Sequence, residues 1–318
     1  MPQRPLIFET YRINVVDDEP TLFTLDGHPI RSDDEIARVL KVATESRFDL
    51  TSQAGRNTYG WSLREFVEYE LEQANRAPIL GLTLARSVMT RAGQTVTEDR
   101  IEDALSEFSP PTAETAHLFF YLSRHLVAVE YNSAIMNTQL WRSSLHRLLD
   151  EASDALEYTS SIRLEPVPRE EEVLNAFRSF TKLTRLRVRL RLPNPELDRR
   201  TEKLRREMID GSIRDYTQDM RNSKGLSQAE DALPFASAAM AQAGYKEGDV
   251  VLTGLREGRL RTVRTGKRAV RGRLEGLKDY VRGMAANARS QEAQHVLAAI
   301  MDEVDRIAEA PTGPEPDR

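Results

Sequence analysis

Residues 183–192 read Leu-Thr-Arg-Leu-Arg-Val-Arg-Leu-Arg-Leu. From residue 185 onward, arginine alternates with an aliphatic residue at every step, and a period of two is typical of a β-strand. In a strand, the four arginines would share one face over about 20 Å, whereas a helix would scatter them around its axis. The stretch therefore predicts a strand that is apolar on one face and cationic on the other.

A row of four like charges needs compensation, and the run itself contains no acidic residue. Either neighbouring strands supply carboxylates or a polyanion binds there. Duplex DNA is such a polyanion, with one charge per ~1.7 Å of axis, and guanidinium groups pair with phosphate in bidentate geometry. The row therefore predicts a DNA-binding surface.

A second basic run begins at Arg256, at the turn of a predicted hairpin, and Glu257 is its only acidic residue. Three further cations lie close to the first run in sequence. No base-reading motif accompanies either run, so we expect weak sequence preference. The residues that we predict to contact DNA are Lys182, Arg185, Arg187, Arg189, Arg191, Arg199, Arg200, Arg259, Arg261, Arg264, Lys267, Arg268, Arg271 and Arg273.

Charge is segregated along the chain, although its 318 residues carry a net charge of only −5. Residues 1–160 contain 15 Lys and Arg against 25 Asp and Glu, and residues 161–290 contain 28 against 18. Residues 291–318 contain 2 against 7. A basic middle segment inside an acidic chain favours one localised polyanion-binding surface.

The apolar runs predict an α+β fold, with antiparallel sheets in both halves, helices flanking them and a helical C-terminal region. The clearest hairpin of the first half joins residues 117–122 to residues 126–131. A second hairpin is predicted over residues 249–264. Residues 98–108 predict a helix that the following prolines would stop.

Two domains follow from the change in charge along the chain. Residues 1–160 are expected to form an acidic α+β domain, and residues 161–310 a basic α+β domain that ends in helices. The proline-rich tail, residues 311–318, is expected to be disordered.

Common catalytic motifs are absent from the sequence. The chain has no cysteine, which excludes thiolate nucleophiles and cysteine-bound metals. It contains no P-loop, dinucleotide-binding glycine motif, nucleophile elbow or paired-histidine zinc motif. The five histidines are scattered, and two acidic clusters, at 33–35 and 170–172, fit the first turns of helices. We therefore expect no enzymatic activity, no cofactor and no bound metal.

Apolar segments long enough to span a bilayer are also absent, since none approaches ~18 residues. Residues 1–5 are not followed by the uninterrupted apolar region of a secretory signal. We expect a cytoplasmic protein that does not insert into the membrane.

The order of elements resembles that of RexA proteins, the family of lambdoid prophage exclusion proteins. The resemblance lies in residues 100–149, expected to form a helix, a proline-interrupted loop, a hairpin and a helix. It continues in Ile162-Arg163-Leu164-Glu165-Pro166, a short helix, the alternating strand and Leu192-Pro193. The layout is similar to that of other bacterial defence proteins, including the DNA-binding subunits of Kiwa systems.

This resemblance implies a homodimer that binds DNA without strict sequence specificity and works with a separate membrane protein in phage defence. The resemblance implies DNA contacts only through a basic surface and not through individual matched residues. In this chain that surface corresponds to residues 185–191 and 259–273. The acidic overall charge departs from that of a simple DNA-binding protein.

Sequence and resemblance together predict a non-catalytic, largely sequence-independent DNA-binding protein of phage defence or prophage exclusion. Two alternatives stay open. One is a metal-dependent nuclease whose carboxylates no motif reveals. The other is a protein-interaction module whose acidic half docks a basic partner.

Overall fold

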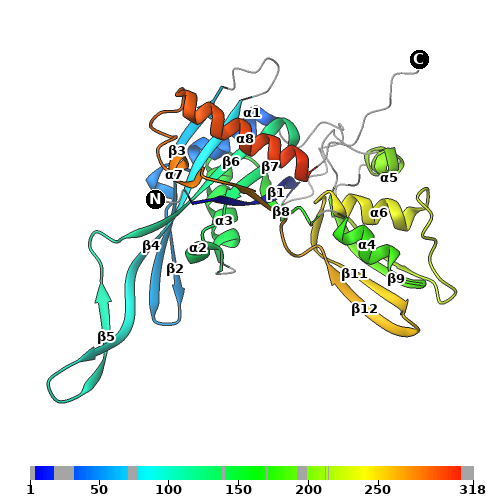
Figure 1. Cartoon of the computed structure of the whole chain (residues 1–318), viewed down its shortest axis with the longest axis horizontal. Coiled ribbons are helices and arrows are strands. Elements are labelled where there is room, and N and C mark those ends of the chain that lie inside the picture. Colours follow the sequence, from blue (N-terminus) through cyan, green and yellow to red (C-terminus); the bar gives the residue numbers. More distant parts are fainter. Residues whose placement is uncertain are drawn as a thin grey trace.

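The chain forms two antiparallel sheets with helices packed against them, so the predicted α+β class is confirmed. Figure 1 shows the larger sheet, here called sheet A, beside the smaller sheet B. The computed structural model describes residues 4–17, 32–70, 78–137, 140–169, 171–191, 199–211, 213 and 215–308.

Sheet A contains nine strands, and all of its pairings are antiparallel. Its strands are β1 (Leu6–Asp17), β2 (Leu50–Ala54), β3 (Asn57–Tyr69), β4 (Ile79–Val96), β5 (Ile101–Glu107), β6 (Ala113–Tyr121), β7 (Leu126–Glu130), β8 (Ser160–Pro166) and β13 (Arg271–Leu274). Their order is β13-β1-β7-β6-β4-β3-β2, with β5 paired to β4 and β8 paired to β1.

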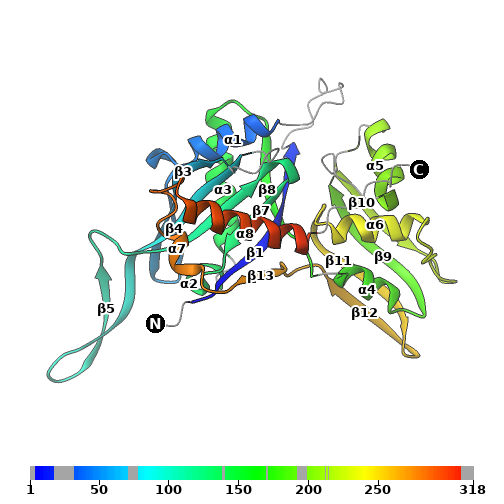
Figure 2. The ribbon, with the colours of Figure 1, turned by 45° about the horizontal axis from the view of Figure 1, so that its top comes forward.

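Helices cover both faces of sheet A. They are α1 (Asp33–Val42), α2 (Ser133–Met136), α3 (Leu140–Ala155), α7 (Lys278–Val281) and α8 (Gln291–Ile307), with short 3₁₀ turns η1 (Ser46–Phe48) and η2 (Leu122–Arg124). One core lies under α1 and α3, and the other lies under α8, which crosses the sheet in Figure 2. The predicted hairpin of residues 117–131 forms β6 and β7, with Phe120 in the first core and Phe119 in the second. Because the hairpin is buried on both faces, its sequence reads as a continuous apolar run.

The helix predicted over residues 98–108 is wrong, since these residues form β5 and the turn before it. The outer end of β4, residues 91–96, pairs with β5 alone and projects from the sheet as a two-stranded ribbon (Figure 1). Val96 and Ile101 face each other in this ribbon and are 79% and 63% exposed. The pairing with β4 therefore decides the conformation, and the helix-like spacing of apolar residues does not.

Sheet B holds a separate core. It contains β9 (Lys182–Arg191), β10 (Asp215–Arg221), β11 (Lys246–Arg256) and β12 (Arg259–Thr265), together with helices α4 (Glu172–Arg178), α5 (Arg199–Asp210) and α6 (Leu233–Gln242). The strand order is β10-β9-β11-β12. Apolar residues from all three helices pack against one face of this sheet. We call the opposite face, which carries Arg185, Arg187 and Arg189, the open face.

The packing divides the chain differently from the predicted boundary at residue 160. β8 pairs with β1, β13 also pairs with β1, and α8 packs on sheet A. Sheet B is thus inserted between β8 and β13. A change in charge along the sequence cannot reveal pairing between strands that lie more than 250 residues apart.

Three predictions lie outside the described residues or differ from them in detail. The tail at 311–318 and the last predicted strand residue, Leu192, are outside the described part of the chain. The C-terminal region, predicted to be helical, forms helices in α7 and α8. It begins with the strand β13, however, because residues 271–274 pair with β1 at the edge of sheet A.

Polar contacts join the two sheets. The Arg12 guanidinium donates to the carbonyl of Ala243 over 2.9 Å and lies 4.6 Å from the centre of the Tyr245 ring. Asn14 donates to the carbonyl of Gly244 over 3.4 Å. A φ of +88° at Gly244 favours glycine at this contact.

His146 of α3 links that helix to β8, because its Nε2 accepts a hydrogen bond from the backbone N–H of Leu164 over 2.9 Å. Burial, aided by the charges of Arg163 and Arg142, lowers the pKa of His146 to about 3. The unfolded chain then binds one more proton than the folded chain between this value and pH ~6.5, so stability falls as pH is lowered through that window.

We expect His146→Gln to remove this acid sensitivity. Between pH ~7 and pH ~5, the wild-type protein should lose about 2 kcal/mol of unfolding free energy through this group, and the variant should not. Urea denaturation at both pH values measures the difference. The exposed His295 provides the control: His295→Gln should keep the wild-type pH dependence, and equal behaviour of the two variants would contradict the prediction.

Candidate nucleic-acid interface

The alternating run at the centre of the sequence is a strand, as predicted. β9 buries Leu186, Val188 and Leu190 in the core of sheet B. Arg187 and Arg189 are exposed on the open face. Arg191 belongs to the same row but is only 9% exposed.

Neighbouring strands supply carboxylates to three of the four arginines in this row. Arg185 makes two hydrogen bonds to Asp219 of β10, over 2.7 and 2.8 Å. Hydrogen bonds from Arg185 and Arg221, two from each, hold the pKa of Asp219 well below its usual range. The carboxylate is therefore charged and occupied.

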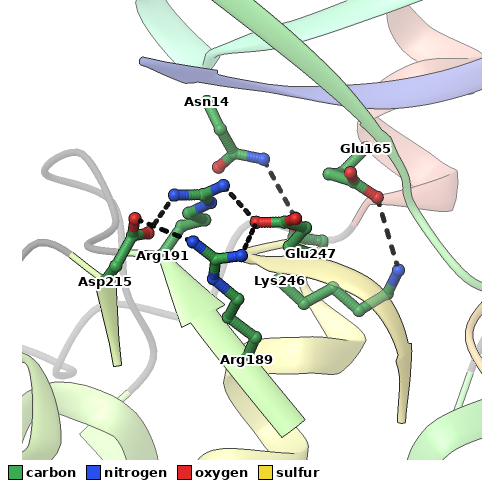
Figure 3. A network of polar contacts seen from close by, with 8 residues as sticks. Asn14, Glu165, Arg189, Arg191, Asp215, Lys246 and Glu247 are labelled. Atoms are coloured by element: carbon green, nitrogen blue, oxygen red, sulfur yellow. Dashed lines mark hydrogen bonds and ion pairs between the residues drawn. The ribbon is translucent and has the colours of Figure 1, made fainter. Parts of the chain in front are cut away.

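The far end of the row is a closed network (Figure 3). Arg189 lies 3.4 Å from Asp215 and 3.0 Å from Glu247, and Arg191 forms ion pairs with the same two carboxylates. Of the two alternatives for this row, compensation by neighbouring strands applies here. The row as a whole is not an uncompensated cationic surface.

Arg187 is the exception. It is exposed and has no acidic partner among the described residues. Asp219 lies opposite it in register but is held by its neighbours. On the other side, Val251 of β11 pairs with both Arg187 and Arg264, which places the two arginines in one row across the open face. Strand spacing puts their backbones about 10 Å apart.

The predicted hairpin of residues 249–264 is present as β11 and β12. Its two-residue turn, Glu257-Gly258, has φ angles of 54° and 73°, as expected for a type I′ turn. Arg259, Arg261 and Arg264 are exposed along β12, the outer strand. In the described part of the chain, none of these three has an acidic partner.

The residues after β12 contribute to a cavity of about 630 Å³ beside sheet A, where the connections to sheet B run. Lys267, Arg268 and Arg271 line it, as predicted cations of the second basic run. Arg142 of α3 and Arg169 after β8 also line it. Sequence reasoning missed these two because each is isolated from the basic runs.

The other predicted residues take no common position. Arg273 pairs with Glu275 over 2.7 Å, and Lys182 is half-buried at the start of β9. Arg199 and Arg200 begin α5, and their side chains lie outside the described residues.

Candidate catalytic and metal-binding groups do not converge. Within the described ranges, no group of three or more histidines or carboxylates could hold a metal ion. The Nδ1 atom of His117 lies 2.7 Å from the carboxylate of Glu130, whereas the Nε2 atom of His125 lies 3.2 Å from the carboxylate of Asp33. The two histidines of the hairpin therefore contact different carboxylates and do not form a common site. The acidic cluster at 33–35 lies in the first turn of α1, as predicted, and Ser32 and Glu35 form a capping box there. Every helix in the described part of the chain is too short or too polar to cross a bilayer.

Comparison with known proteins gives one family. A family described as a domain of unknown function (DUF4747) matches residues 48–271, which run from η1 to the start of β13 and include all of sheet B. No curated protein matches the chain.

Proposed function

We propose that this chain, which belongs to the family described as a domain of unknown function (DUF4747), binds duplex DNA without catalysis and with weak sequence preference. The observation that supports this function is a set of exposed arginines without acidic partners among the described residues. Arg187 and Arg264 share the open face, whereas Arg259 and Arg261 lie on the other face of β12, because side chains alternate along a strand.

The pairing pattern favours an external anion at this surface. Carboxylates near the open face are already held by other arginines, so they are not available to Arg187 or Arg264. Guanidinium groups on neighbouring strands of a sheet have the spacing to contact successive phosphates. Contacts to the phosphates alone would position DNA without reading its bases.

We further propose that the protein acts in the cytoplasm as a homodimer in phage defence or prophage exclusion, together with a separate membrane protein. The resemblance in layout to RexA proteins and Kiwa DNA-binding subunits supports this role. A strain that lacks the protein should then be infected more efficiently by at least one phage, as measured by plaque counts, and complementation should restore protection.

DNA binding is tested by fluorescence anisotropy with two labelled duplexes of unrelated sequence. The protein should bind both duplexes with the same affinity. If it makes four phosphate contacts, raising the salt concentration from ~50 to ~200 mM should weaken binding about a hundredfold. No binding, or binding that is independent of salt, would contradict the proposal. If the protein instead cuts plasmid DNA in the presence of Mg²⁺ or Mn²⁺, it is a nuclease. If a partner protein stays bound after nuclease digestion, the protein is an interaction module.

A further inference from the structure

The cavity beside sheet A, where the two connections to sheet B run, is strongly cationic. Five of its lining residues are basic: Arg142, Arg169, Lys267, Arg268 and Arg271. Among the described residues, Glu9 is the single acidic lining residue, and its carboxylate contacts Arg271 at 3.0 Å and the hydroxyl of Tyr11 at 2.6 Å. The remaining four cations form no ion pair in the parts of the chain that the structure describes, although the charge of Arg142 also acts on Glu165.

The segments that bring these cations together are far apart in the sequence. Arg142 lies in α3, Arg169 lies in the connection from sheet A to sheet B, and Lys267 and Arg268 lie in the return connection. Each connection has to pass this point because sheet B is inserted between β8 and β13. The fold therefore holds four like charges around one hollow, and a concave arrangement increases the positive potential inside it.

The other lining residues form an apolar wall. Tyr11 and Trp141 are 5% and 6% exposed, and their rings pack edge to face with centres 5.4 Å apart. Rigid, buried rings cannot move to fill the hollow. The positive potential also reaches buried neighbours, since the charge of Arg142 contributes to the lowered pKa of His146.

We propose that this cavity binds a phosphate monoester. Guanidinium groups pair with the oxygens of a phosphate dianion in bidentate geometry. A volume of about 630 Å³ is in the range of small-molecule sites and suits one nucleotide. A duplex cannot enter a cavity of this size, so the monoester is carried either by a free nucleotide or by the phosphorylated end of a DNA strand.

This site does not rest on the proposed DNA binding by sheet B. Arg142 and Arg169 lie outside the surface formed by Arg187 and β12, and substitutions can separate the two sites.

The test uses the full chain and isothermal titration with adenosine 5′-monophosphate, inorganic phosphate and adenosine. The two phosphates should bind saturably, and adenosine should not. The double variant Arg142→Gln/Arg169→Gln should lose about tenfold affinity for the monophosphate for each guanidinium removed. The single variant Arg169→Gln changes an exposed residue and should lose about tenfold with an unchanged melting temperature.

The matched control is Arg261→Gln/Arg264→Gln, which removes two charges from sheet B and should keep wild-type affinity for the monophosphate. Absence of saturable phosphate binding, equal binding of adenosine, or full affinity in the Arg169→Gln variant would overturn the proposal. Oligonucleotides with a 5′-phosphate or a 5′-hydroxyl identify the carrier. Tighter binding of the phosphorylated strand indicates a DNA end, whereas equal binding of the two strands, together with binding of the monophosphate, indicates a free nucleotide.

Discussion

The double variant Arg187→Glu/Arg264→Glu is expected to bind duplex DNA about a hundredfold more weakly than the wild-type protein at ~100 mM salt. Both side chains are exposed, both lie in one row across the open face, and neither has an acidic partner among the described residues. Removing two phosphate contacts should also lower the slope of log K against log salt by about 1.8. Anisotropy titrations at several salt concentrations give both quantities.

The control is a second double variant that changes the net charge by the same amount but at the other end of the molecule. Arg56 lies in the turn between β2 and β3, Arg100 lies just before β5, and their side chains are 76% and 75% exposed. Figure 1 shows β2 and β5 at the end of the molecule opposite sheet B. Arg56→Glu/Arg100→Glu should bind DNA nearly as well as the wild-type protein. If both double variants weaken binding equally, net charge is responsible, and the open face is not the site.

Both unrelated duplexes should lose the same affinity in the Arg187→Glu/Arg264→Glu variant, because contacts to phosphates carry no sequence information. A loss confined to one duplex would show that these arginines read bases. That result would contradict the weak sequence preference predicted from the absence of a base-reading motif.

The strands of sheet B could be predicted from the sequence, but their partners could not. Alternation of Arg and aliphatic residues is sufficient to predict β9, because one buried face selects a period of two. The register then decides which side chains lie opposite one another. Asp215 and Asp219 are 24 or more residues from the arginines of β9 that they pair with, and Glu247 is 56 residues from Arg191. Nothing local marks these contacts.

The cavity illustrates the same limit. Its cations come from α3, from the two connections between the sheets and from the start of β13, so no short window of sequence contains them. The ribbon of β4 and β5 is a different case. Ile101 and Leu105 are four residues apart, which suits a helix face, but pairing with β4 places both on one face of the ribbon as well. One element of the resemblance to RexA proteins, the helix before the proline-interrupted loop, is therefore a strand here.

The second large effect concerns stability. Lys246→Met is expected to lower the free energy of unfolding by about 3 kcal/mol. Lys246 is completely buried, its Nζ donates to the carbonyl of Gly248 over 3.0 Å, and it lies 3.9 Å from Glu165 (Figure 3). Methionine keeps the buried volume but leaves the carboxylate of Glu165 without its partner.

Adding Glu165→Gln should recover most of that loss. Burial lowers the pKa of Lys246 and raises the pKa of Glu165, so each ion is costly to bury and the pair only offsets this cost. Neutral side chains remove both costs together. Urea denaturation of the wild type, the two single variants and the double variant gives the coupling between the residues. The exposed pair Arg147–Glu151, 3.8 Å apart, is the control, and Arg147→Gln should change stability by less than ~0.5 kcal/mol.

The pH dependence separates charge from packing. Because the folded pKa of Lys246 is lowered, the unfolded chain binds more protons between that pKa and ~10.5, and this residue makes stability rise with pH in that window. The raised pKa of Glu165 has the opposite effect, since the folded chain binds more protons between ~4.5 and the folded pKa of Glu165, and stability falls as pH rises through this window. Both contributions should disappear in the Lys246→Met/Glu165→Gln variant. If the double variant instead remains as unstable as Lys246→Met, the loss comes from packing and from the bond to Gly248, because removal of the unpaired carboxylate would then have no benefit.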